Sequence, residues 1–337
     1  MQKESINEIK AISSSWQFND HIGAIKVRAA LGRNNYQVAS GLYKIGDPDS
    51  KSDVYVSANY KLSFDILRRN LKSINAWILV LDTKGINVWC AAGKGTFGTN
   101  ELIKQIENSK LHAIVKHRRL IVPQLGAPGI SAYKVKDQTG FKVKYGPVRA
   151  SDIQPFLASG YKASETMRTV HFSIKDRLIL TPVEISNSLL ALLGVLILFF
   201  VLSGITPEGY SIKIAFMEGM KSSVYILAAY LSGAFITPVL LPWLPSRYFA
   251  AKGIITSGIV FSIMILTGVI SNSFIQTIGW FFISISIASF LAMNFTGAST
   301  FTSLSGVKKE MRLFVPVQIT LSVIGFLIII ISNFFLI

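Results

Sequence analysis

VYVSANYKLSFDILRRNLKSINAWILVLD, residues 54–82, contains two apolar runs with a helical pattern between them. The runs at 54–58 and 77–82 are short and end in polar residues, as buried parallel strands do. The intervening segment has apolar residues three or four positions apart, which is the spacing of one helix face: Phe64, Leu67 and Leu71. The stretch therefore predicts a strand, a helix and a second strand.

The residues that follow continue this alternation. A helix is predicted over 99–108, and strands are predicted over 120–124 and 141–145. Alternating strands and helices are typical of an α/β domain, here a Rossmann-like one with a mostly parallel sheet. Ligands of such sheets bind beyond the carboxyl ends of the strands. Three loops are expected there, roofing one pocket: 83–98, 126–130 and 146–153.

The second half of the chain has the composition of a membrane protein. Half of the 337 residues are hydrophobic; residues 1–180 hold 27 Lys and Arg against 14 Asp and Glu, and residues 181–337 hold 7 against 4. This change predicts a cytoplasmic domain over 1–180 and a transmembrane domain over 181–337. Five segments are long enough to cross a hydrocarbon core about 30 Å thick: 183–203, 222–244, 253–271, 274–295 and 316–337.

Two details qualify these spans. Pro238 and Pro242 are expected to kink or end the second one. The break at 271–273 is short, so four spans are the alternative to five. The spans are nearly free of ionisable side chains, which favours an anchor or a helix assembly over a transporter.

Basic residues between the spans predict the orientation. With five spans, the loops on the side of the first domain contain Arg247, Lys252, Lys308, Lys309 and Arg312. The opposite side has Lys213 and Lys221. Because Lys and Arg accumulate on the cytoplasmic side, a multi-pass protein of the cytoplasmic (inner) membrane is predicted, with its N-terminal domain in the cytoplasm. The N-terminus also lacks the apolar core of a secretory signal.

The loop DTKGINVWCAAGKGTFGT, which follows the second predicted strand, holds the single cysteine of the chain, Cys90. Asn87 is a favourable N-cap, and Gly93 and Gly95 are favourable terminators, so a short helix is predicted from Val88 to about Gly93. Cys90 is then the third helical residue, where free backbone N–H groups and the helix dipole favour negative charge on sulfur.

Small residues flank this cysteine. Ala91, Ala92 and Gly93 add little bulk, and Lys94 adds positive charge on the same side. A flat macrocycle with an axially ligated metal would fit against such a helix. A small buried cysteine in a glycine-rich turn is an equally good interpretation of the local chemistry.

NVWCAAGKGTFGT, residues 87–99, resembles the cap-helix signature of the membrane-bound corrinoid protein of the microbial mercury-methylation pair. The resemblance extends along the chain over SANYKLSFDILRR (57–69), LVLDTKGINVWCAAGKGTFGT (79–99), VPQLGAPG (122–129), YGPVRASDI (145–153) and DRLILTPVE (176–184). The soluble half is also similar to the corrinoid domain of the corrinoid iron–sulfur protein of the acetyl-CoA pathway. That relative is soluble and carries its own cluster cysteines, whereas this chain has five predicted spans and no spare cysteine.

The resemblance implies a membrane-anchored corrinoid-dependent methyltransferase that passes a methyl group from the cobalt of a cobamide to Hg(II), giving methylmercury. Cys90 matches the cysteine that ligates cobalt from below as a thiolate, and the alternative histidine pattern D-x-H-x-x-G is missing. The residues matched to the cap helix are Asn87, Val88, Trp89, Cys90, Ala91, Ala92, Gly93 and Lys94. The corrin rim or the nucleotide tail is assigned to Gly126, Ala127, Pro128, Gly129 and Arg149. Ordinary strand-to-helix turns are an equally good interpretation of the last group.

Several partners are implied with this family. One cysteine excludes an iron–sulfur cluster held by this chain alone, so a ferredoxin-like protein with two 4Fe-4S clusters is the implied electron donor. The methyl group is implied to come from methyltetrahydrofolate. The net charge of +16 lies mainly beside the lipid bilayer and without a nucleic-acid-binding motif, so no nucleic-acid partner is predicted.

Two other functions are open at this stage. One is a corrinoid methyl carrier of one-carbon or acetyl-CoA-type metabolism, with mercury as an opportunistic acceptor. The other is a membrane transporter or sensor whose cytoplasmic domain binds a ligand through Cys90. The charge-poor spans speak against the second alternative.

Overall fold

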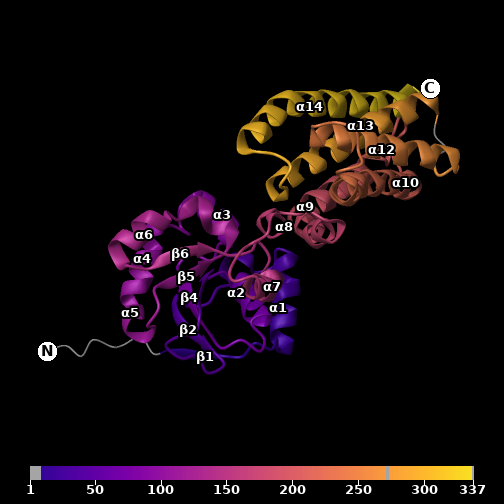
Figure 1. The fold of residues 1–337 in the computed structure, drawn as a ribbon. Coiled ribbons are helices and arrows are strands. Elements are labelled where there is room, and N and C mark those ends of the chain that lie inside the picture. Colours follow the sequence, from indigo (N-terminus) through magenta and orange to yellow (C-terminus); the bar gives the residue numbers. More distant parts are fainter. Residues whose placement is uncertain (1–8, 271–272, 336–337) are drawn as a thin grey trace. The chain divides into compact units, whose positions relative to one another are not determined.

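The computed structural model describes residues 9–270 and 273–335, which form two compact units. Of the described residues, the first unit contains 9–27 and 31–171, and the second contains 28–30, 172–270 and 273–335. Figure 1 shows the ribbon of each unit.

The first unit is built on a six-stranded sheet with the order β1-β2-β4-β3-β5-β6. The strands are β1 (Lys10–Ile12), β2 (Gly41–Ile45), β3 (Val54–Ala58), β4 (Ala76–Leu81), β5 (Arg119–Val122) and β6 (Lys142–Tyr145). Strands β4, β3, β5 and β6 are parallel, and β2 pairs antiparallel with β4. The predicted mostly parallel α/β sheet is confirmed, and its four predicted strands differ from the structure only at their ends.

Helices cover both faces of this sheet (Figure 1). They are α1 (Phe18–Arg28), α2 (Lys61–Asn70), α3 (Val88–Lys94), α4 (Thr99–Asn108), α5 (Leu111–Ile114), α6 (Ala132–Thr139), α7 (Ile153–Ala158) and α8 (Glu165–Arg168), with the short 3-10 helices η1 (Arg33–Asn35), η2 (Gln124–Gly129) and η3 (Ala150–Asp152). Leu102 and Val135 of α4 and α6 pack in one core with Leu79, while Phe64 and Phe156 of α2 and α7 pack in the other. Because β3 and β4 lie between two cores, all of their residues are buried.

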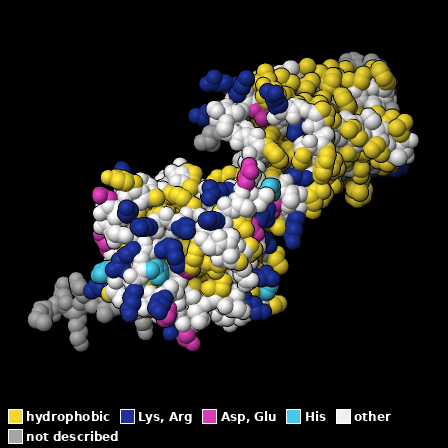
Figure 2. Space-filling view, in the orientation of Figure 1, with side chains coloured by type: hydrophobic (Ala, Val, Ile, Leu, Met, Phe, Trp, Pro, Cys, Tyr) yellow, Lys and Arg dark blue, Asp and Glu magenta, His cyan; other side chains and the backbone are white. Residues whose placement is uncertain are grey.

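The second unit is helical, and its described residues form five helices long and apolar enough to cross a membrane. Its elements are α9 (Ile174–Leu202), the hairpin β7 (Ile205–Thr206) and β8 (Gly209–Tyr210), α10 (Ile212–Leu231), η4 (Ser232–Ile236), α11 (Thr237–Leu240), α12 (Phe249–Leu266), α13 (Phe274–Asn294), η5 (Phe295–Ala298) and α14 (Leu304–Phe335). Apolar side chains cover most of the face of this unit that is visible in Figure 2. The number of apolar helices agrees with the prediction of five spans.

The helix ends differ from the predicted spans, because several polar first turns are helical. Lys213 and Lys221 lie in α10, Lys252 lies in α12, and Lys308, Lys309 and Arg312 lie in α14. The prediction that these residues lie in loops is therefore wrong, and of the basic residues used for the orientation only Arg247 lies outside a helix. The predicted break at 271–273 falls partly outside the described residues, and Ser273 caps α13.

The second span changes its helical geometry before Pro238. Residues Ser232–Ile236 form a π-helical turn, and the Thr237 hydroxyl donates to the Ser232 carbonyl at 2.7 Å. Proline has no N–H and collides with the carbonyl one turn earlier, so a widened turn is a usual way to accommodate it. The helix ends at Leu240, before Pro242, as the two prolines predicted.

Small residues bring the helices of this unit together. Gly233 and Gly253 both lie against the backbone of Ala288, and Gly279 faces Gly325 across α13 and α14. Polar contacts also cross the bundle: the Gln318 amide donates to the Ser289 hydroxyl at 2.9 Å, where both side chains are buried. The helical unit is therefore tightly packed.

Candidate functional site

Helix α3 begins beyond the carboxyl end of β4 and presents Cys90 in its first turn. The Asn87 side chain accepts a hydrogen bond from the Cys90 backbone N–H at 3.0 Å, which caps the helix. Its amide nitrogen lies 3.5 Å from the Cys90 sulfur and donates to it. Gly95 ends the helix in the left-handed conformation, with φ of 82°. The predicted helix and its cap are confirmed, with Gly95 rather than Gly93 as the terminator.

A buried asparagine fixes the turn that leads into α3. Asn59 directly follows β3, and its side-chain oxygen accepts from the backbone N–H groups of Thr83 at 3.1 Å and Gly85 at 3.0 Å. Its amide donates to Asp82 at 3.2 Å. Sequence reasoning did not single out Asn59, although a polar residue at the end of a buried strand was a signal that could have found it.

The charged groups at this turn are paired. Lys84 donates to the Asp82 carboxylate at 2.6 Å, and this hydrogen bond holds the pKa of Asp82 below its usual range against the effect of partial burial. The carboxylate of Glu101 on α4 accepts from the Asp82 backbone N–H at 2.9 Å. The turn between β4 and α3 is thus fixed by hydrogen bonds to Asn59 and to Glu101.

The residues of α3 divide between two faces. Trp89, Cys90, Gly93 and Lys94 are exposed, and 43% of the Trp89 side chain is accessible. The structure places the other predicted residues of the helix inside: Val88, Ala91 and Ala92 are buried in the core of the sheet. The two alanine side chains therefore do not lie on the face that carries the sulfur, and their contact with a ligand stays a prediction.

The second predicted loop, η2, packs directly on α3. A side chain at Gly129 would meet the backbone of Ala92 and Phe97, and one at Gly126 would meet the Phe97 ring. Beside this contact, the Thr99 hydroxyl at the start of α4 accepts a hydrogen bond at 2.8 Å from the N–H of Ser131, which lies two residues after η2. Glycine is thus required on η2 by close packing. Ala127 is half-buried and Pro128 is exposed beside it.

The third predicted loop joins this group through the backbone. The Gln124 N–H donates to the Pro147 carbonyl at 3.5 Å, so η2 and the loop after β6 are neighbours. Arg149 is exposed, and its guanidinium donates to the His171 carbonyl at 2.9 Å. The structure therefore gives Arg149 a partner in its own unit, and its contact with a cofactor stays a prediction.

The donor atoms near α3 are those of one cysteine. In the described part of the chain, no three His, Cys, Asp or Glu side chains lie close enough together to hold a metal ion. Cys90 therefore offers a single sulfur ligand, which suits a metal whose other ligands belong to a cofactor.

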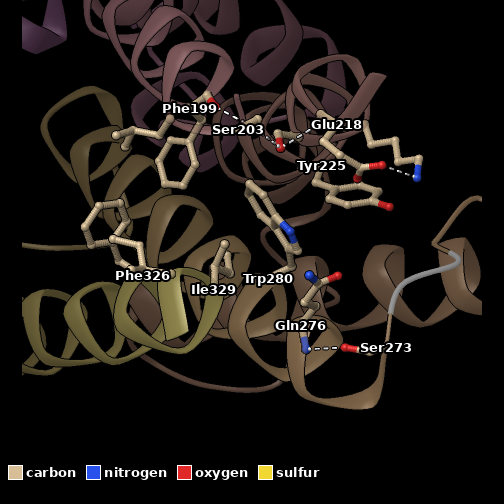
Figure 3. Close-up of a pocket in the computed structure, with 13 residues that line it drawn as sticks. Phe199, Ser203, Glu218, Tyr225, Ser273, Gln276, Trp280, Phe326 and Ile329 are labelled. Carbon is tan, nitrogen blue, oxygen red and sulfur yellow. Dashed lines mark hydrogen bonds and ion pairs between the residues drawn. The ribbon is translucent and has the colours of Figure 1, made fainter. Parts of the chain in front are cut away.

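The helical unit has a cavity of its own, of about 270 Å³, shown in Figure 3. Trp280 forms its wall and packs against the rings of Phe199 and Tyr225, each with centroids 5.3 Å away. Glu218 and Lys221 form an ion pair of 2.8 Å at the cavity. The two charges at this cavity thus neutralise each other, and its aromatic side chains pack on one another.

Comparison with known proteins finds relatives for part of the first unit. Residues 28–157 match the family described as the CO dehydrogenase/acetyl-CoA synthase delta subunit. The chain is 33% identical over 135 residues to the acetyl-CoA decarbonylase/synthase complex subunit gamma of Archaeoglobus fulgidus, which is 40% of this chain and 28% of that protein. Identity to the gamma subunit of Methanopyrus kandleri is 37% over 128 residues, 37% of this chain and 27% of that one.

A third relative is the corrinoid/iron-sulfur protein large subunit of Moorella thermoacetica. It is 32% identical over 122 residues, which cover 36% of this chain and 27% of the relative. The chain thus spans little more than a quarter of the length of these relatives. Within that limit, the chain carries a domain homologous to these subunits, and the matched region includes β3, β4, α3 and η2.

Proposed function

We propose that this protein is a membrane-anchored corrinoid-dependent methyltransferase in which the Cys90 sulfur ligates cobalt and Hg(II) accepts the methyl group. The observation that carries the proposal is the exposed Cys90 sulfur in the first turn of α3, in a domain homologous to a protein named as a corrinoid/iron-sulfur subunit. The position of α3 beyond the parallel strands agrees with the usual binding edge of such sheets.

The exposed face of α3 fits a broad, flat group. A side chain built at Gly93 would have no atom within 4 Å, so the helix surface one turn from Cys90 is open. Gly93 is followed by the exposed Lys94, whose charge suits an amide-rich or phosphate-bearing cofactor edge. On the buried side, Gly129 lies against Ala92 and holds η2 close to the helix. The residues present are therefore compatible with a cobamide.

The chain's own residues have distinct tasks in this site. A bound cobamide supplies a cobalt centre that accepts and releases a methyl group. Cys90 would hold the cobalt through its electron-rich sulfur, and Asn87 would orient that sulfur through its amide while capping the helix. Asn59 accepts from two backbone N–H groups of the preceding turn and would keep the sulfur in position.

The two candidate functions differ in the group that accepts the methyl group. The motif at 87–99 resembles that of the mercury-methylating protein and supports Hg(II), a soft ion suited to a carbanion-like methyl group. The names of the relatives are those of acetyl-CoA complex subunits and favour the second candidate, a methyl carrier of one-carbon metabolism. Both candidates use the same Cys90 site.

The proposed partners follow from what the chain lacks. With one cysteine it has no ligand set for an iron–sulfur cluster of its own, so a ferredoxin-like protein with two 4Fe-4S clusters would supply the electrons. Methyltetrahydrofolate would supply the methyl group. Five apolar helices would hold the chain in the cytoplasmic membrane with the first unit in the cytoplasm, and no nucleic acid is involved.

Anaerobic reconstitution of the full chain with cobalamin tests the ligand role. We expect wild-type protein to retain cobalamin after gel filtration with visible and EPR spectra of sulfur-ligated cobalt. Cys90→Ala should lose that signature, and the matched control Thr96→Ala, in the same loop, should keep it. Identical spectra for wild type and Cys90→Ala would contradict the proposal.

The acceptor needs a separate assay. Protein loaded with methylcobalamin should form methylmercury from mercuric chloride faster than free methylcobalamin does. Cofactor retention without faster methylmercury formation would leave the Cys90 site standing and select the one-carbon carrier.

A further inference from the structure

A second cavity lies at the end of the helical unit where α12 and α14 begin. It encloses about 490 Å³ and has polar and basic walls, which include Arg247, Tyr248, Thr302, Ser303 and Lys309. The first two precede α12, and the others come from the segment that enters α14. All of the residues that line this cavity belong to the second unit, whereas Cys90 belongs to the first.

Its two cations are not neutralised. Arg247 and Lys309 are exposed, and within the described residues neither side chain has a hydrogen-bond or ion-pair partner. Glu310 also lines the cavity, but its side chain is buried and its carboxylate accepts from the Ala250 N–H at 2.6 Å in the first turn of α12. The Glu310 carboxylate thus binds the protein backbone, and the Arg247 and Lys309 side chains remain available to bind an anion.

Hydroxyl groups complete a lining suited to phosphate. The side chains of Thr302 and Ser303 border the same space as the two cations. Phosphate oxygens accept hydrogen bonds from hydroxyls and from guanidinium and ammonium groups, with charge-assisted bonds to the latter. These donors therefore suit a phosphate ester better than an uncharged, apolar ligand.

Aromatic side chains also border this cavity. Phe301 and Tyr248 line it, and Phe301 is 54% exposed. Trp243, in the loop before α12, is 63% exposed, and the guanidinium of Arg177 lies 5.3 Å from its ring. Tryptophan and tyrosine are enriched at the level of lipid head groups.

We propose that this cavity binds the phosphate of an anionic phospholipid, with Arg247 and Lys309 as the recognising cations. The exposed Phe301 ring would contact the upper acyl chain, an interaction that a free phosphate ion cannot make. The predicted orientation puts this end of the helices on the cytoplasmic side, where anionic lipids attract basic groups.

Native mass spectrometry of the full chain in detergent tests the assignment. The chain is titrated with dioctanoyl phosphatidylglycerol, with dioctanoyl phosphatidylcholine and with inorganic phosphate. We expect phosphatidylglycerol to bind most tightly. The double variant Arg247→Gln/Lys309→Gln should weaken its binding roughly thirty-fold, about five-fold for each cation.

The control removes the same charge from the same helix end. Lys308→Gln/Arg312→Gln changes two exposed cations that do not line the cavity. This variant should therefore change the affinity for phosphatidylglycerol by less than about three-fold. Equal losses in the two double variants would overturn the site in favour of a diffuse basic surface. Inorganic phosphate binding as tightly as phosphatidylglycerol would overturn the lipid assignment.

Discussion

Replacing Asn59 by alanine should loosen the turn that carries α3. The Asn59 oxygen accepts from the Thr83 N–H, the Gly85 N–H and the Thr83 hydroxyl. The hydroxyl also lies 2.6 Å from the Ile86 carbonyl and keeps that acceptor in the variant. The two backbone N–H groups have no such substitute. Each lost partner costs about 1–3 kcal/mol, so a total of about 3 kcal/mol is expected.

Hydrogen–deuterium exchange of the full chain measures this loss locally. A cost of about 3 kcal/mol corresponds to a roughly hundred-fold increase in local opening. Peptides covering 82–95 should therefore exchange about a hundred times faster in Asn59→Ala. Asn70→Ala is the matched control, because that side chain donates only to the Ile66 carbonyl within its own helix. Unchanged exchange over 82–95 would refute the positioning role of Asn59.

Three further changes have distinct expected results. Gly93→Ala should raise the stability of cofactor-free protein by about 0.5–1 kcal/mol in thermal melts, because glycine destabilises a helix and the space over Gly93 is open. The same methyl group should lower cobalamin retention, and unimpaired retention would argue against a corrin on this face. Asp20→Asn should cost about 2 kcal/mol at pH 7. Burial raises the pKa of Asp20, but hydrogen bonds from Lys61 and Arg68 outweigh it and leave the pKa well below its usual range, so the ionised carboxylate stabilises the fold above about pH 4. The difference between wild type and variant should therefore shrink only below that pH, and a difference independent of pH would contradict this. Gln318→Leu should leave the melting temperature unchanged or raised, since the buried Gln318 oxygen has no partner among the described residues; a large decrease would show that the amide is needed for packing.

The central strands were predictable because their signal is local. The apolar runs at 54–58 and 77–82 are buried on both faces, so every side chain in them agrees with the assignment. Strands β1 and β2 gave no such signal. The three residues of β1 are all partly or fully exposed. Strand β2 contains Gly41 and Lys44, so its extended conformation depends on pairing with β4. Tertiary pairing of this kind cannot be seen in a short stretch of sequence.

The long apolar helices were predictable in number and less so in extent. Hydropathy finds the apolar middle of each span, but a capped polar turn can extend the helix beyond it. Ser173 and Asp176 form such a capping box at the start of α9, well before the predicted span at 183. Lys252 is also held inside α12, where its ammonium donates to the Leu241 carbonyl. Charged residues near span ends are therefore poor markers of helix boundaries.

At the candidate site, the small residues beside Cys90 have two different causes. Ala91 and Ala92 are buried, and Ala92 lies against Gly129, so core packing accounts for their size. Packing gives no such reason for Gly93, which lies within α3 on the exposed face with nothing near its missing side chain. A glycine there destabilises the helix by about 0.5–1 kcal/mol relative to alanine. This open position, more than the run of small residues as a whole, is what packing does not explain, and a ligand above the Cys90 face is the reason that we propose for it.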